Sequence, residues 1–362
     1  MRVLAPHEER HDINLRPAAT AKVWVGAGQE HETIAVPGVA LGHADALVAI
    51  ELSTVCGSDV HTVAGHRSAP APLVLGHESV GRIIALGDDG VKASDGSELR
   101  IGDRVVWSVT VSCGTCDRCR AGLVQKCRTV QKYGHERIGP RWELTGGFAT
   151  HAHLRAGTTI VRVPEALPAA VLAPASCATA TAWAAVNRGA AGRALEGMRV
   201  LVYGAGLVGL SAVAIAADAG AEVTVVDPSA KRRAFAERFG GTAAAASTGP
   251  ADIVIEASGH AVADAITAAD VGGVAVLVGS VFPSDPIAFD AEDAVRRMLT
   301  ITGVHNYTGR DLADAAGFLA GTGRAYPFSE VVGAVYPLAE VDAAIAAASA
   351  QDAPLRVAVN PR

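Results

Sequence analysis

The segment Val200-Leu-Val-Tyr-Gly204-Ala-Gly206-Leu-Val-Gly209 decides the fold of the second half of this chain. It places the pattern G-x-G-x-x-G between a run typical of a buried strand and a run, residues 210–219, typical of a helix. The three glycines suit a tight turn, close approach of the backbone to a pyrophosphate, and close packing of helix against strand. We therefore expect a dinucleotide-binding turn formed by Gly204, Gly206, Leu207, Val208 and Gly209.

An acidic residue follows at the spacing that such a turn predicts. Asp227 ends the next predicted strand, about 20 residues beyond Gly204, where a carboxylate suits the two hydroxyls of an adenosine ribose and favours NAD. Lys231, Arg232 and Arg233 follow closely and could neutralise the 2'-phosphate of NADP. NADP is therefore the less favoured alternative, and Arg232 joins Asp227 among the candidate cofactor-binding residues.

The alternation of strand, glycine turn and alanine-rich helix continues after residue 178. It predicts a parallel doubly wound sheet, the Rossmann arrangement, with Val278 at the end of one strand as a further candidate for cofactor binding. Before residue 171, short β-branched runs cut by glycine and proline predict closely spaced strands and a β-rich, barrel-like half. The alternation fades near residue 307, so the remaining residues could return to the first domain.

Length and composition fit two domains and a small-molecule partner. The chain has 362 residues, half of them hydrophobic. This length exceeds what one hydrophobic core normally serves. With a net charge of -6 and no run of like charge, the sequence shows no basic patch of the kind that binds nucleic acid or a membrane surface. We see neither a signal peptide nor an apolar run of membrane-spanning length, which predicts a cytoplasmic protein.

All six cysteines can be assigned to two metal sites. Four of them follow the spacing C-x2-C-x2-C-x7-C, which supplies a complete tetrahedral thiolate shell from one loop and predicts a structural zinc lobe at 113–127. An iron–sulfur cluster is the rival, but the single quartet and the missing proline after its last cysteine favour zinc. Thiolate ligands need a reducing compartment, in agreement with a cytoplasmic protein. The four candidates are Cys113, Cys116, Cys119 and Cys127.

The two remaining cysteines predict a second, catalytic zinc. A catalytic zinc takes three protein ligands and keeps one position open, and two cysteines with one histidine form a recognised shell. Cys56, His77 in Gly76-His77-Glu78, and Cys177 would supply it. Taken singly, each has a structural explanation as a buried thiol or a core histidine. Together with the quartet and the glycine turn, they favour a metal site.

These motifs, in this order and over nearly the whole length, resemble the zinc-dependent medium-chain alcohol dehydrogenase family. Within that family the chain is most similar to the alcohol dehydrogenases associated with phosphonate catabolism. The segments that carry this similarity are Trp107-Ser-Val-Thr-Val-Ser-Cys113, Gln125-Lys-Cys127, Lys132-Tyr-Gly-His135-Glu and Leu144-Thr-Gly-Gly-Phe148.

The resemblance implies an α/β fold with two domains. A GroES-like, β-rich catalytic domain would comprise residues 20–178 and a return of the chain at 306–362. A Rossmann domain that binds NAD would comprise residues 179–305. The resemblance also implies a homodimer or homotetramer.

The resemblance further implies roles for residues around the zinc ligands. Asp59 would fix the His77 ring and Glu78 would lie just behind the metal. Ser58 would take the proton of the alcohol and His61 would pass it to solvent. The candidate catalytic residues are therefore Ser58, Asp59, His61 and Glu78. Separately, Arg356 on the last predicted strand is expected at the cofactor pyrophosphate, with a surface arginine as the competing interpretation.

The expected activity is hydride transfer between an alcohol and NAD, giving a ketone or an aldehyde. The alcohol would be a polyol, a cyclitol or a hydroxyphosphonate-like compound. If it is anionic, Lys132, His135 and Arg137 are the cationic cluster to test first. One alternative is a catalytically silent nucleotide-binding scaffold or sensor of the same fold, and a zinc-free reductase is another. Neither has a use for the open metal site and the proton relay.

Overall fold

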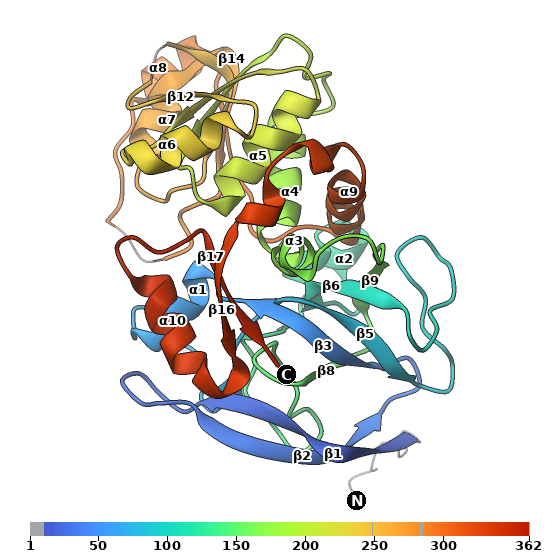
Figure 1. The fold of residues 1–362 in the computed structure, drawn as a ribbon. Helices are drawn as coiled ribbons and strands as arrows, with labels where there is room; N and C mark the ends of the chain where they lie inside the picture. The colour runs from blue at the N-terminus through green and yellow to red at the C-terminus, as the bar shows by residue number, and fades with distance from the viewer. Residues whose placement is uncertain (1–10, 248, 283–284, 362) are drawn as a thin grey trace, which may run out of the picture. The chain divides into compact units, whose positions relative to one another are not determined.

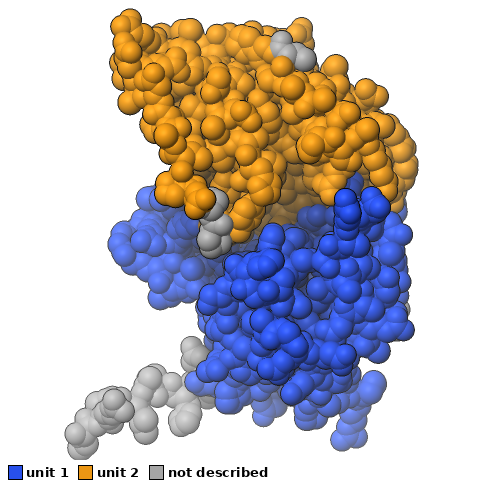
Figure 2. Space-filling view, turned by 90° about the vertical axis from the view of Figure 1, so that its left-hand side faces the viewer, with its two compact units in different colours: residues 1–176, 332–362 blue, residues 177–331 orange. Residues whose placement is uncertain are grey.

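The computed structural model describes residues 11–247, 249–282 and 285–361. The chain divides into two compact units, which Figures 1 and 2 show. One comprises Met1–Ser176 with Val332–Arg362, and the other comprises Cys177–Val331. The first unit therefore takes residues from both ends of the chain, and the second is a continuous segment.

The second unit contains a parallel sheet with the strand order β12-β11-β10-β13-β14-β15. The order reverses beside β10, so that later strands lie on both sides of it, as in a doubly wound sheet that binds its ligand at this point. The strands are β10 (Arg199–Tyr203), β11 (Glu222–Val226), β12 (Thr242–Ala244), β13 (Ala251–Glu256), β14 (Ala269–Leu277) and β15 (Thr300–Gly303). The helices between and around them are α4 (Ala178–Ala190), α5 (Leu207–Asp218), α6 (Ala230–Glu237), α7 (Val262–Ala268), α8 (Ala291–Arg296) and α9 (Gly309–Ala320), with 3-10 turns η3 (Thr322–Ala325) and η4 (Phe328–Glu330).

The central strand and the first helix of this sheet are apolar on all sides. Residues 200–203 of β10 are buried, as expected for a strand that helices cover on both faces. Helix α5 is buried over most of its length because it packs against both the sheet and α4. The predicted Rossmann fold is confirmed.

The boundary of the second unit differs from the predicted position. The sequence placed the return to the first domain at residue 306, where the strand–helix alternation ends, but the structure places it at Val332. Helix α9 packs against α4, and the ring centroids of Trp183 and Phe318 lie 6.0 Å apart. Packing therefore keeps residues 306–331 in the second unit, although their sequence no longer shows the alternation of strand and helix.

The first unit contains two sheets, and Figure 1 shows the chain's last strands among the earliest ones. The larger sheet has the order β16-β17-β3-β5-β6-β7, with β8 paired to β3 and β9 to β6, and the smaller has the order β2-β1-β4. The strands are β1 (His11–Trp24), β2 (Glu32–Leu41), β3 (Ala46–Thr54), β4 (Leu73–Val74), β5 (Glu78–Leu86), β6 (Arg104–Val111), β7 (Gln131–Lys132), β8 (His151–Leu154), β9 (Thr158–Arg162), β16 (Val332–Pro337) and β17 (Arg356–Asn360). The helical segments are α1 (Gly57–Val63), α2 (Asp117–Arg120), η1 (Val124–Lys126), α3 (Ala169–Leu172), η2 (Ala173–Ser176), η5 (Leu338–Glu340) and α10 (Val341–Ser349).

Two apolar clusters form the core of this unit. One lies among β1, β2 and α10, and the other contains Trp107, Tyr133 and Trp142. The β-rich half predicted from the sequence, GroES-like by resemblance, is confirmed. Among the described residues, no single helix is long and apolar enough to span a membrane, although the bent pair Ala169–Ser176 and Ala178–Ala190 passes that test by length and composition.

Candidate active site

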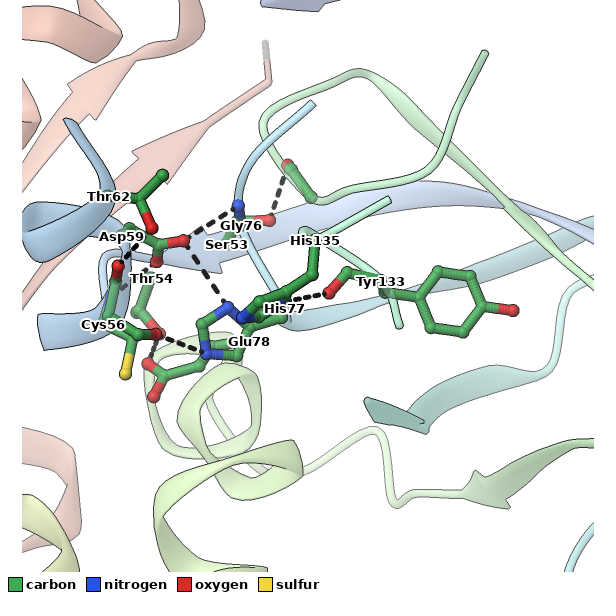
Figure 3. A network of polar contacts seen from close by, with 12 residues as sticks. Ser53, Thr54, Cys56, Asp59, Thr62, Gly76, His77, Glu78, Tyr133 and His135 are labelled. Atoms are coloured by element: carbon green, nitrogen blue, oxygen red, sulfur yellow. Dashed lines mark hydrogen bonds and ion pairs between the residues drawn. The ribbon is translucent and has the colours of Figure 1, made fainter. Parts of the chain in front are cut away.

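One buried carboxylate joins the two turns that carry Cys56 and His77. Asp59, on the first turn of α1, accepts a hydrogen bond from the backbone N–H of Cys56 at 2.9 Å and one from Gly76 at 3.3 Å (Figure 3). Gly76 has a φ of +85°, and a Cβ there would lie within 3.0 Å of Phe148. Close packing on Phe148 therefore requires glycine at this position, and the two hydrogen bonds to Asp59 link the turns that carry the candidate ligands.

The His77 ring is held between Asp59 and Ser58. Its Nδ1 lies 3.5 Å from Oδ1 of Asp59 (Figure 3). Its Nε2 lies 3.5 Å from the Ser58 hydroxyl. Burial lowers the pKa of His77, but the Asp59 carboxylate and the Cys56 thiol outweigh burial and hold that pKa well above its ordinary value. A carboxylate on the Nδ1 side makes Nε2 the better ligand atom, as in metal sites generally.

The carboxylate of Glu78 is fully buried and accepts hydrogen bonds from two residues, one charged and one neutral. Arg356 donates to it twice, from Nε at 2.7 Å and from Nη2 at 2.8 Å, and the Thr54 hydroxyl donates at 2.5 Å. Burial raises the pKa of Glu78, and the Arg356 guanidinium opposes that shift. In this structure the guanidinium of Arg356 pairs with a carboxylate, and its expected contact with the cofactor pyrophosphate stays a prediction.

Cys177 joins these residues at the end of η2. The hydroxyl of its neighbour Ser176 donates to the backbone carbonyl of His77 at 3.3 Å, which fixes this end of the turn. Ligand atoms of Cys56, His77, Glu78 and Cys177 all lie within 4.8 Å of one another. Two thiols and an imidazole at this spacing are the donor set that catalytic zinc takes, with a carboxylate behind them.

The four cysteines of the lobe also converge. Sγ of Cys116 lies 3.5 Å from Sγ of Cys119 and 4.0 Å from that of Cys127, which in turn lies 3.5 Å from Sγ of Cys113. A tetrahedral zinc with bonds of about 2.3 Å separates its sulfurs by about 3.8 Å, so this spacing fits one zinc ion. Hydrogen bonds from the backbone and hydroxyl of Thr115 lower the pKa of Cys113 to about 5, which favours the thiolate that a metal needs.

The glycine turn at the start of α5 has the geometry that its motif predicts. Gly204 has a φ of +97°, and a Cβ on Gly209 would lie 1.9 Å from the Gly204 carbonyl oxygen. A Cβ on Gly206 would meet no atom within 4 Å, so the turn is open on that side. The open side and the N-terminus of α5, where Leu207 and Val208 lie, fit a bound pyrophosphate.

Asp227 lies beside this turn, at the end of β11. Its carboxylate accepts from the backbone N–H of Ala205 and from that of Ser229, each at 2.8 Å. Arg232 is exposed on α6, whereas Arg233 donates to the carbonyl oxygen of Asp227 at 2.8 Å.

Val278 is buried at the end of β14, and its N–H donates to the Glu256 carbonyl at 2.9 Å. The predicted cofactor residues of the sheet therefore gather around the carboxyl ends of β10, β11 and β14, whereas Arg356 lies in the first unit.

The sequence did not point to Arg67, and it placed His135 in a cationic cluster with Lys132 and Arg137. The His135 ring centroid lies 5.0 Å from that of His77, and its Nε2 lies 3.0 Å from Nη1 of Arg67. Burial lowers the pKa of His135 well below its ordinary value, as do the neighbouring His77 and Arg67. Arg137, by contrast, is exposed and donates to the backbone of Ala71. The sequence offered one sign of a role for Arg67, namely its position shortly after α1.

Known proteins resemble the chain over both units. Residues 42–165 match the family described as alcohol dehydrogenase GroES-like domain, and residues 208–321 match the family described as zinc-binding dehydrogenase. An L-threonine 3-dehydrogenase from Pectobacterium carotovorum is 30% identical over 300 residues, which cover 76% of this chain and 80% of the relative.

Solved structures share the whole architecture. A crystal structure of an alcohol dehydrogenase from Thermotoga maritima has a TM-score of 0.86 at 26% identity and covers 95% of this chain and 99% of its own. A putative zinc-binding dehydrogenase from Sinorhizobium meliloti, bound to NADP, has a TM-score of 0.81 at 25% identity, with coverage of 95% and 99%. The chain belongs to the zinc-dependent medium-chain alcohol dehydrogenase family.

Membership settles the class of reaction and of cofactor. The protein is a zinc-dependent alcohol dehydrogenase that uses NAD(P) and acts on a small alcohol or carbonyl compound. The similarity to the phosphonate-associated subgroup stays a prediction, because the relatives reported above carry other names.

Proposed function

We propose that this dehydrogenase transfers hydride between NAD and a polyol, cyclitol or hydroxyphosphonate-like alcohol, at a zinc held by Cys56, His77 and Cys177. The observation that most supports this proposal is that the ligand atoms of Cys56, His77 and Cys177 lie close together, beside a carboxylate oxygen of Glu78. The ligands come from widely separated parts of the sequence, so their convergence is a property of the fold. A silent scaffold or a zinc-free reductase has no use for such a set.

The residues around the metal have distinct roles in this proposal. Bound zinc supplies a Lewis acid that makes the substrate hydroxyl more acidic. The Ser58 hydroxyl, 3.5 Å from the His77 Nε2, takes the hydroxyl proton. His61 lies one helical turn further along α1, on the same face, and passes the proton to solvent. Asp59 orients the His77 ring, and Glu78 lies behind the ligands with its charge balanced by Arg356.

We further propose NAD as the preferred coenzyme. The Asp227 carboxylate, held at the end of β11 by two backbone N–H groups, is placed to accept from ribose hydroxyls and would repel a 2'-phosphate. Arg233, which could have neutralised that phosphate, donates instead to the carbonyl oxygens of Asp227 and Pro228. The ratio of kcat/KM with NAD to that with NADP tests this preference, and a ratio below one contradicts it.

The lobe of four cysteines is proposed to hold the second zinc, with a structural role. A closed thiolate shell leaves no position for substrate, so this zinc orders the loop between α2 and β7. The six cysteines, all within the described part of the chain, form no disulfide, which supports a reducing, cytoplasmic location. A homodimer or homotetramer is the assembly to expect, and light scattering checks it.

The experiment that tests the function combines metal analysis with turnover. The purified protein is expected to contain two zinc ions per chain and to form NADH from at least one alcohol in a panel of polyols, cyclitols, hydroxyphosphonates and L-threonine. L-Threonine belongs in the panel because it is the alcohol in the name of a 30% identical relative. One zinc per chain without turnover on any of these alcohols would favour the silent scaffold.

A further inference from the structure

One guanidinium near the catalytic ligands has a neutral partner where a carboxylate would be expected. Arg67 Nη1 lies 3.0 Å from Nε2 of His135, and within the described ranges of the chain no carboxylate pairs with Arg67. Ten other arginines in the same ranges are paired with carboxylates, among them Arg82, Arg104 and Arg356. Among the residues that the structure describes, no acidic side chain therefore neutralises the positive charge of Arg67.

The hydrogen bonds of His135 fix its role as an acceptor. Its Nδ1 lies 2.9 Å from the Tyr133 carbonyl oxygen, which can only accept, so Nδ1 carries a proton. In the neutral ring Nε2 then has a lone pair, which receives the N–H of Arg67 at 3.0 Å. A histidine that accepts in this way orients a guanidinium without cancelling its charge.

Backbone packing holds both residues against the metal ligands. The N–H groups of His66 and Arg67 both donate to the carbonyl oxygen of His61, at 2.9 and 3.2 Å, which pins the loop to α1. On the other side, a Cβ on Gly134 would lie 2.7 Å from the Gly76 carbonyl oxygen, so the turn before His135 packs directly on the turn before His77. The rings of His135 and His77 are consequently 5.0 Å apart, and Arg67 is one side chain removed from a zinc ligand.

Resting on the dehydrogenase function proposed above, we propose that Arg67, oriented by His135, binds an oxyanion group of the alcohol substrate, either a carboxylate or a phosphonate. A guanidinium has five N–H donors in a planar fork, and His135 takes one of them. Arg67 is only partly buried, so the remaining donors can reach a ligand. The fork matches two oxygens of a carboxylate or phosphonate in bidentate geometry.

The competing explanation is a surface arginine whose aliphatic stem merely covers the loop. Arg137 is an example, since it is exposed and its guanidinium donates to the backbone carbonyl of Ala71. Arg67 differs because it is partly buried and a neutral side chain next to His77 fixes its head group. Of the cationic cluster expected from the sequence, the structure thus places His135 by the metal site and adds Arg67 in place of Arg137.

The test compares charged alcohols with uncharged analogues of similar shape. One pair is 3-hydroxybutyrate and 3-hydroxybutyramide. The other is 2-hydroxypropylphosphonate and 4,4-dimethyl-2-pentanol, in which a tert-butyl group takes the place of the phosphonate. The wild-type enzyme with zinc and NAD should have the higher kcat/KM for an anionic member. Substituting Arg67→Met should raise KM for that member on the order of 10- to 100-fold, the usual effect of losing a charged hydrogen-bonded pair, with kcat nearly unchanged. The uncharged members should change less than about threefold.

A binding measurement without turnover gives a second readout. Calorimetric titration with methylphosphonate and with acetate should show binding to the wild type, and Arg67→Met should abolish the tighter of the two. Arg67→Lys keeps the charge but not the fork and should fall between wild type and Arg67→Met. Arg100→Met, at an exposed arginine of the same unit, is the matched control and should behave as wild type. If Arg67→Met loses zinc or folds poorly, Arg67→Gln, which is closer in length and keeps an amide donor, replaces it.

The outcomes separate this inference from the function on which it rests. Turnover of uncharged alcohols with no preference for an anion, or an equal loss on both members of a pair in Arg67→Met, overturns the role of Arg67 and leaves the dehydrogenase intact. No turnover of any alcohol by zinc-loaded protein overturns the dehydrogenase proposal itself. Preference for the hydroxy acid over the hydroxyphosphonate, or the reverse, identifies which oxyanion the guanidinium takes.

Discussion

At the scale of single residues, the charge of Glu78 depends on one partner far away in the sequence. The Glu78 carboxylate is fully buried, and Arg356, 278 residues later, supplies its counterion through two hydrogen bonds. Taking a carboxylate out of water costs several kcal/mol unless its charge is paired. The last strand, β17, is therefore tied electrostatically to the residue that follows the zinc ligand His77.

Substituting Arg356→Met should destabilise the protein by about 3–5 kcal/mol, because it leaves a buried charge without its partner. Chemical unfolding of the zinc-loaded protein measures the change. Arg128→Met is the matched control, since Arg128 and Asp117 are 58% and 62% exposed and solvent screens the attraction between such groups. Equal losses in the two variants would show that Arg356 does not act through the buried charge of Glu78.

At the scale of elements, two glycines of one turn have different tasks. Gly209 lies where a Cβ would overlap the Gly204 carbonyl oxygen at 1.9 Å, whereas a Cβ on Gly206 would meet no protein atom within 4 Å. The first glycine is therefore needed for the start of α5 to pack on the turn, and the second leaves space for a ligand.

Substituting Gly209→Ala should lower the free energy of unfolding by about 1–3 kcal/mol or more, through overpacking at the start of α5. Gly206→Ala should leave stability within about 1 kcal/mol of wild type but raise KM for NAD, because its methyl group enters the open side of the turn. Thermal unfolding without cofactor and steady-state kinetics measure the two effects. A Gly206→Ala protein with unchanged KM would contradict the placement of the pyrophosphate there.

The cysteine lobe, residues 113–127, makes a separate prediction for an element held by metal. Cys119→Ala opens the closed thiolate shell, so zinc should fall from two ions per chain to one. The loss should expose the segment between α2 and β7 to proteolysis, since structural zinc supplies on the order of 10 kcal/mol to local folding. Limited proteolysis with mass analysis locates the cut. Leu123→Ala, at an exposed position of the same loop, retains all four thiolates, and cleavage of both variants at the same rate would contradict the role of the metal.

At the scale of the whole molecule, the sequence predicted what depends on short spacings. The glycine turn, the quartet and the alternation of strand and helix are local patterns. The matched families cover the quartet, within residues 42–165, and most of the alternating part, within residues 208–321. The convergence of Cys56, His77 and Cys177 was inferred from residue types and resemblance, and the ligand atoms do lie together.

Other features depended on long-range packing and were not visible in the sequence. Arg356 was expected at a pyrophosphate, and only the pairing of β17 with β3 brings its strand close to Glu78. Arg67 and His135 are 68 residues apart, and no periodicity connects them. Trp107 and Tyr133, which belong to the segments that carry the subgroup similarity, lie in the core because their apolar bulk fills the space inside the larger sheet.

The central claim is that Cys56, His77 and Cys177 hold a zinc on which turnover depends. Zinc content per chain, measured by elemental analysis for wild type and for Cys177→Ser purified identically, tests it most directly. We expect two zinc ions per chain in the wild type and one in the variant, with alcohol-dependent NADH formation lost. Equal zinc content in the two proteins, with turnover preserved, would contradict it.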